Sequence, residues 1–110
     1  MPCHHKTLSQ ERWQAFSFCE QMGNIGSEVH RAFMWQKRNE QYVNLAIDRA
    51  LELLDLTLQD ARWRGPKLKE IARVRELLCY AAGGANPYDT KLDDLDRYFL
   101  SFALAARLKR

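Results

Sequence analysis

Residues that could carry out acid–base, nucleophilic or metal chemistry are few and scattered. Glu28 and His30 lie two residues apart, whereas the di-iron sites of helical bundles need Glu-x-x-His pairs with further inward glutamates. The chain contains no phosphate-binding glycine loop, no GxSxG nucleophile elbow and no HExxH zinc motif. We therefore expect no catalytic residue, no metal site and no cofactor, and we expect that the protein is not an enzyme.

The three cysteines form no recognisable redox or zinc pattern. Residues 3–5 read Cys-His-His and could bind a metal ion adventitiously, but we expect residues 1–7 to be a flexible tail. Cys19 and Cys79 lie on or beside apolar helical stripes, so we expect both side chains to be buried as small apolar residues. An odd number of cysteines without a CxxC motif argues against a disulfide framework and a structural zinc site.

Charge is distributed unevenly along the chain, whose formal net charge is +3. Residues 39–63 hold two basic and five acidic side chains, and residues 64–83 hold five basic and two acidic ones. Cations clustered around Trp63 have the composition used to bind phosphate backbones. The competing interpretation is a solvated helix face partly neutralised by its own glutamates. The candidate nucleic-acid-binding residues are Arg62, Arg64, Lys67, Lys69, Arg73 and Arg75.

The elements that must position these residues are helices. The chain has 110 residues, 46% of them hydrophobic, which suits one domain with a real core. Five glycines and three prolines are too few for the turns of an all-β sandwich. No apolar run approaches the roughly 18 residues needed to span a bilayer. Because no apolar stretch of a signal peptide is present either, we expect a cytoplasmic protein without membrane contact.

Apolar residues recur every three or four positions in four segments, which predicts amphipathic helices. The first helix is expected to run unbroken across Gly23 and Gly26, and short polar or Gly-Pro breaks separate the others. Short connections favour antiparallel neighbours, so we predict one all-α domain over residues 1–110, an antiparallel up-down-up-down four-helix bundle. The predicted helices cover residues 8–37, 39–63, 67–83 and 90–109.

The second predicted helix carries more apolar surface than one bundle needs. A second seam lies about 120–140° from its core stripe. Fully burying one leucine contributes roughly 1.5–3 kcal/mol, so we favour contact with another copy of the chain. The alternative is a broad core face covered by a neighbouring helix or by the N-terminal tail. The seam comprises Tyr42, Leu45, Arg49, Leu53 and Leu56.

Small residues on the first predicted helix form another candidate contact. Cys19, Gly23 and Gly26 are spaced so that a neighbouring backbone can approach closely, and we count them with the oligomer interface. The alternative is that Gly23-Asn24 marks a kink in the helix.

Four strings of residues, in this order and spacing, resemble a known family of small bacterial four-helix-bundle proteins. That family was noticed in intervening sequences of 23S ribosomal RNA genes, and it is related to the accessory variability determinant proteins of diversity-generating retroelements. The strings are Gly23–Val29 (GNIGSEV), Arg49–Thr57 (RALELLDLT), Lys69–Glu76 (KEIARVRE) and Tyr98–Arg107 (YFLSFALAAR).

The resemblance implies a closed homo-oligomer, commonly a pentamer of bundles arranged as a tapered barrel, with no catalytic activity and no cofactor. For the retroelement relatives it also implies a basic surface that binds nucleic acid and a reverse transcriptase. We therefore expect a self-assembling scaffold whose partners are RNA or DNA and a nucleic-acid enzyme. The alternative is a protein–protein interaction module without a nucleic-acid role.

Overall fold

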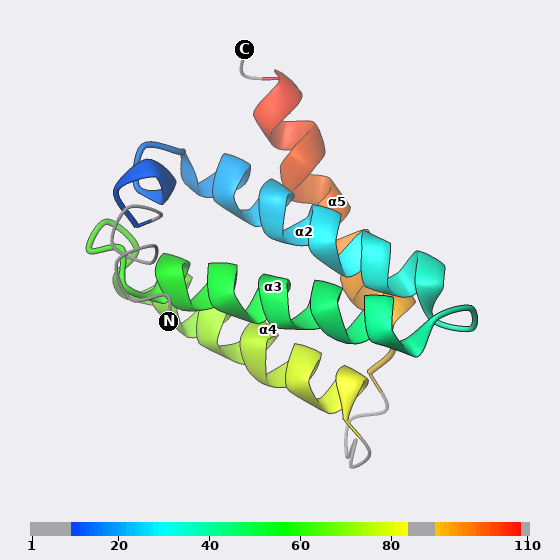
Figure 1. The fold of residues 1–110 in the computed structure, drawn as a ribbon. Coiled ribbons are helices and arrows are strands. Elements are labelled where there is room, and N and C mark those ends of the chain that lie inside the picture. Colours follow the sequence, from blue (N-terminus) through cyan, green and yellow to red (C-terminus); the bar gives the residue numbers. More distant parts are fainter. Residues whose placement is uncertain (1–9, 84–89, 109–110) are drawn as a thin grey trace.

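The structure, a computed structural model, describes residues 10–83 and 90–108, and all regular structure in these ranges is helical (Figure 1). The predicted all-α class is thereby confirmed. No helix in the described part of the chain is long and apolar enough to cross a membrane. The four longer helices are α2 (Phe18–Trp35), α3 (Glu40–Leu58), α4 (Pro66–Ala82) and α5 (Leu92–Leu108).

Three of these helices begin at residues suited to a helix N-terminus. Ser17 accepts a hydrogen bond from the Glu20 N–H, while the Glu20 carboxylate accepts one from the Ser17 N–H, which completes a capping box for α2. The side chain of Asn39 caps α3. Gly65 adopts a φ of 74°, and Pro66 follows it as the first residue of α4, where its missing N–H does no harm.

The prediction of one uninterrupted helix over residues 8–37 is wrong at its N-terminal end. Residues 10–13 are helical, the chain then turns, and α2 begins anew after Ser17. The capping box satisfies N–H groups at the start of α2, so a second helix can begin there. The buried Trp13 anchors the preceding turn against the body of the protein.

The second predicted helix, over residues 39–63, is also too long. α3 ends at Leu58, because the chain turns so that Asp60 and Trp63 can bury their side chains. The helices predicted over 67–83 and 90–109 agree with α4 and α5 to within two residues. The tail predicted over residues 1–7, the turn predicted near residues 84–87 and residue 109 lie outside the described residues.

The helices pack in a row, and the last one crosses it. Figure 1 shows α2, α3 and α4 side by side with alternating direction, α3 contacting both of its neighbours. α5 crosses α2 obliquely, makes its main contact there, and touches α4 only sparsely. A closed up-down-up-down bundle stays a prediction.

The core is built from the central parts of all four predicted apolar stripes. Ala15 and Ala61 lie within the helices predicted over residues 8–37 and 39–63, but they are exposed because the chain has left the helix at both positions. The stripe residues that the structure buries are Phe18, Met22, Ile25, Val29, Ile47, Ala50, Leu54, Ile71, Val74, Leu78, Leu92, Leu95 and Phe99.

Two glycines allow α2 and α5 to approach each other closely. A Cβ atom at Gly26 would lie 2.5 Å from the Cβ of Phe99, and one at Gly23 would lie 3.2 Å from the Cα of Ala103. Both glycines lie inside an unbroken α2, so the helix does not break at Gly23-Asn24, and both glycines face a close neighbour. The neighbour is α5 of the same chain.

We expect Gly26→Ala to destabilise the fold by about 1–3 kcal/mol, because the new methyl group forces Phe99 and the α5 backbone outward. Alanine's higher helix propensity, worth roughly 0.8–1 kcal/mol, offsets part of this cost. Urea unfolding monitored by circular dichroism measures the difference. Ser27→Ala, at an exposed neighbouring position on α2, is the control. Equal stability of Gly26→Ala and wild type would contradict the close contact.

Candidate interaction surfaces

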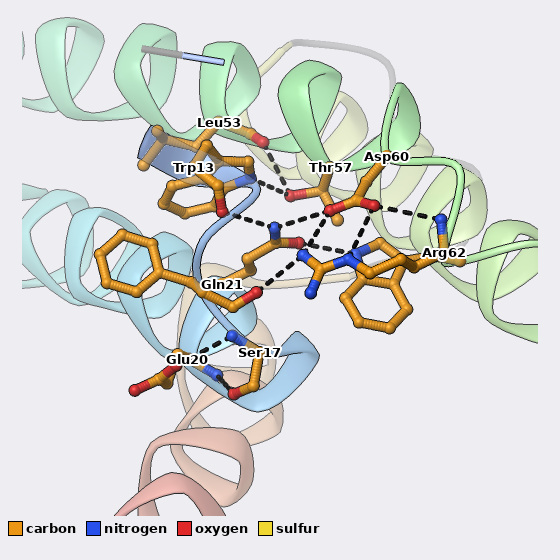
Figure 2. Close-up of polar contacts among 10 residues, drawn as sticks. Trp13, Ser17, Glu20, Gln21, Leu53, Thr57, Asp60 and Arg62 are labelled. Atoms are coloured by element: carbon orange, nitrogen blue, oxygen red, sulfur yellow. Dashed lines mark hydrogen bonds and ion pairs between the residues drawn. The ribbon is translucent and has the colours of Figure 1, made fainter. Parts of the chain in front are cut away.

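A buried polar cluster ties the N-terminal segment (residues 10–16) to α2 and to the α3–α4 connection (Figure 2). The indole N–H of Trp13 donates to Thr57 Oγ1 at 2.8 Å. The side-chain amide of Gln21 donates to the carbonyl of Trp13 and to Asp60, and its oxygen accepts from the indole N–H of Trp63. In the described residues, every buried side-chain nitrogen and oxygen has a partner, so this cluster is structural.

Arg62 belongs to this cluster. Its guanidinium forms an ion pair with Asp60 at 2.6 Å and donates a hydrogen bond to the carbonyl of Phe16. The guanidinium also lies over the ring of Trp63, 4.4 Å from the centroid. Hydrogen bonding to Arg62 holds the pKa of Asp60 below its usual value, although burial of the carboxyl opposes this shift. Arg62 is therefore engaged within its own chain.

The remaining predicted cations separate into paired and outward-facing groups. Arg75 forms an ion pair with Asp55 of α3 at 2.7 Å, and Arg73 lies 3.6 Å from Glu76. The exposed cations gather at the beginning of α4, and we name Arg64, Lys67 and Lys69 the α4 basic surface.

The aromatic residue expected to accompany these cations faces inward. Trp63 is buried, packs edge-to-face on Phe18 and donates its indole N–H to Gln21. The Lys67 ammonium lies 5.2 Å from both the Phe18 and the Trp63 ring centroids. The expectation that Trp63 is available to a nucleic acid is therefore wrong, because the polar cluster binds its only polar atom.

The predicted seam on α3 divides into an exposed half and a buried half. Leu45 is 65% exposed and Tyr42 is 50% exposed, whereas Leu56 is only 6% exposed. Leu56 lines a pocket together with Trp13 and Phe16, so the N-terminal segment covers this end of the seam, as the alternative interpretation expected.

The middle of the seam is intermediate. Arg49 is exposed and lies 3.7 Å from Glu52, and Leu53 is partly buried against the core. The other predicted interface residues lie on α2. Gly23 and Gly26 face α5 of the same chain, as described above, and Cys19 is partly exposed beside Gly23 in a shallow pocket.

The exposed face of α5 was missed by the sequence analysis. Leu100, Leu104 and Leu108 are 54%, 49% and 85% exposed, and their spacing of four places them on one side of the helix. The C-terminal half of α5 extends beyond α2 in Figure 1. We name these three residues the α5 leucine stripe. The repeated spacing of four was visible in the sequence, but the inward stripe of the same helix already accounted for its periodicity.

The histidine and cysteine side chains described by the structure are His30, Cys19 and Cys79. His30 lies on the surface with its Nδ1 3.1 Å from Asp96 of α5. Cys79 is exposed, so the expectation of a buried cysteine is wrong at this position. Among residues 10–83 and 90–108 no group of three metal-binding side chains gathers, and residues 3–5 lie outside these ranges.

We expect Arg62→Gln to destabilise the fold by about 1–3 kcal/mol at neutral pH, because it leaves the buried carboxylate of Asp60 without its main partner. The folded-state pKa of Asp60 lies below the unfolded value of 3.8, so this stabilisation is complete above that pH and is lost as the pH falls through the folded-state pKa. The substitution should therefore flatten the acid side of the stability–pH profile, measured by urea unfolding between pH 2 and 7.

Arg31→Gln is the matched control, because Arg31 forms an exposed ion pair with Glu28. Surface pairs contribute about 0–1 kcal/mol, so this variant should follow the wild-type profile. Parallel profiles for Arg62→Gln and wild type would show that Arg62 does not control the ionisation of Asp60.

No protein-family model, no curated protein and no solved structure matches this chain. The functional argument therefore starts from the surfaces of the molecule itself. These are the α4 basic surface, the exposed half of the α3 seam and the α5 leucine stripe.

Proposed function

We propose that the protein is a non-enzymatic, cytoplasmic scaffold that assembles into a closed homo-oligomer of antiparallel four-helix bundles. The observation that carries the proposal is the exposure of Tyr42 and Leu45 on α3, which the chain's own helices leave uncovered. Large apolar side chains gathered on one face favour a partner surface. The resemblance to the intervening-sequence proteins adds the expectation of five subunits.

A basic surface supports a nucleic-acid role for this scaffold. Arg64, Lys67 and Lys69 project near the beginning of α4, and no ion pair holds Arg64 or Lys69 among the residues that the structure describes. A closed oligomer repeats this surface once per subunit, so a weak local site gains avidity. We propose RNA or DNA, with a nucleic-acid enzyme such as a reverse transcriptase, as the partner. A protein–protein interaction module without nucleic acid is the second candidate, favoured by the internal pairing of Arg62 and Arg75.

Native mass spectrometry of the purified protein, with and without nuclease treatment, tests the assembly. We expect one dominant homo-oligomer that persists after nuclease treatment, because protein surfaces and not nucleic acid hold it together. A monomer at micromolar concentration would contradict the scaffold. Size-exclusion chromatography with light scattering gives an independent mass for the same sample.

The double variant Arg64→Gln/Lys69→Gln tests nucleic-acid binding. We expect weaker binding to a labelled RNA or DNA, and a log–log salt dependence whose slope falls by about 1 for each lost phosphate contact. Fluorescence anisotropy between about 50 and 200 mM salt measures both quantities.

The control for this pair is Lys37→Gln/Arg38→Gln, which removes two exposed cations from the turn between α2 and α3. This control should bind like wild type. Binding that is insensitive to salt, or an equal loss of affinity in both double variants, would contradict the proposal that the α4 basic surface binds nucleic acid. Capture of one dominant protein, undisturbed by nuclease, would instead support the interaction module.

A further inference from the structure

The exposed half of the α3 seam forms one wall of a groove between α2 and α3. Near one end a cavity of about 340 Å³ is lined by Trp35, Tyr42, Leu45 and Ala46. A second cavity of about 330 Å³ is lined by Phe16 and Leu53, and Glu28 borders both cavities. We name these two cavities, which share Glu28 as a lining residue, the α2–α3 groove. Its walls combine apolar side chains with the charged Arg12, Glu28, Arg31 and Arg49, and a groove of this kind can bind the side of an amphipathic helix.

The α5 leucine stripe has the form that fits such a groove. An amphipathic helix binds a groove through apolar side chains three or four residues apart, and Leu100, Leu104 and Leu108 have this spacing. They cover about 12 Å of helix at 1.5 Å per residue. The groove is unfilled in one copy, and the stripe is uncovered in the same copy.

One chain cannot bring its own stripe into its own groove. α5 packs on the side of α2 that carries Gly23 and Gly26, whereas the groove opens on the side that carries Glu28 and Arg31. The stripe faces away from its own α2, since α5 contacts that helix through its other side, which includes Asp96, Phe99, Phe102 and Ala103. A second copy of the chain therefore supplies the occupant.

Charge favours one orientation of the bound helix. The first turn of α5 is acidic, with Asp93 and Asp94, both of which form exposed ion pairs with Arg97, and Arg107 lies in its last turn. Arg12 and Arg49 border one end of the groove. With α5 antiparallel to α3 of the other copy, the acidic turn lies at the Arg12 end and Leu108 enters the cavity beside Tyr42. At the Tyr42 end Arg107 would meet Arg31 together with its ion-pair partner Glu28, whereas the reverse orientation would place Arg107 beside both Arg12 and Arg49.

We infer that the α5 leucine stripe of one copy binds in the α2–α3 groove of the next copy. This inference rests on the proposed self-assembly and specifies its contact. The two contacting surfaces differ, so the interface is heterologous, and successive copies joined in this way close into a ring when the rotation allows it. Each copy then uses its groove once and its stripe once.

Two single variants and their mixture test the contact. Leu45→Glu places a charge in the groove, and Leu104→Glu places one in the stripe; both side chains are exposed, so the fold should persist. We expect each variant alone to be monomeric by native mass spectrometry. An equimolar mixture should form a 1:1 heterodimer and no larger species, because Leu45→Glu keeps its stripe and Leu104→Glu keeps its groove.

Leu68→Glu on α4 is the matched control, since it changes an exposed leucine outside both surfaces and should assemble like wild type. Circular dichroism checks that each variant is folded, and Leu45→Ser and Leu104→Ser replace any that is not. Self-association of Leu45→Glu would indicate stripe-to-stripe contact, and self-association of Leu104→Glu would indicate groove-to-groove contact; either result overturns the inference.

The same samples separate this inference from the scaffold proposal. If wild type is monomeric, the proposed self-assembly fails, and the inference fails with it. If wild type assembles but both glutamate variants assemble equally well, only the groove contact is wrong. A mixture that stays monomeric while wild type assembles also overturns the groove contact.

Discussion

The close contact between Gly26 of α2 and Phe99 of α5 determines where the last helix lies. Because Gly26 has no side chain, the aromatic side chain packs directly against the α2 backbone. α5 therefore crosses α2 at this point, buries Leu92, Leu95 and Phe99, and makes few contacts with α4. The same crossing carries the C-terminal half of α5 beyond the core, which leaves its outer leucines in solvent. One packing constraint thus produces both the core and an apolar outer surface.

The buried amide of Gln21 has a comparable role at the other end of α2. Its side chain forms hydrogen bonds with the carbonyl of Trp13 in the N-terminal segment, and with Asp60 and Trp63 in the α3–α4 connection. Such a cluster is stable only when all of its polar atoms have partners, and this one meets that condition. It also buries Trp63 and engages Arg62, which remains exposed, in contacts within the chain, although both look like ligand-binding residues in the sequence.

Helical periodicity was sufficient to predict the class of the fold and the inward faces of the four helices. It did not predict the break before Ser17 or the end of α3 at Leu58, because both depend on contacts between residues distant in sequence. The bond from Trp13 to Thr57 is one such contact. The glycine spacing correctly predicted a close approach but could not identify α5 as the neighbour. The outer leucines were missed because one helix can carry two stripes, and the inner one explained the pattern.

The separation of Gly26 and Phe99 along the chain has a consequence for folding during synthesis. Of the four longer helices, α2 is synthesised first, and its main partner α5 is synthesised only after α3 and α4. Until then α2, α3 and α4 can associate only as an open row with the glycine side of α2 uncovered. The entropic cost of bringing α2 and α5 together grows only slowly with the length of the chain between them. The time needed to synthesise that chain therefore determines when α5 can pack against α2. A nascent chain halted before residue 92 lacks the helix that completes its core.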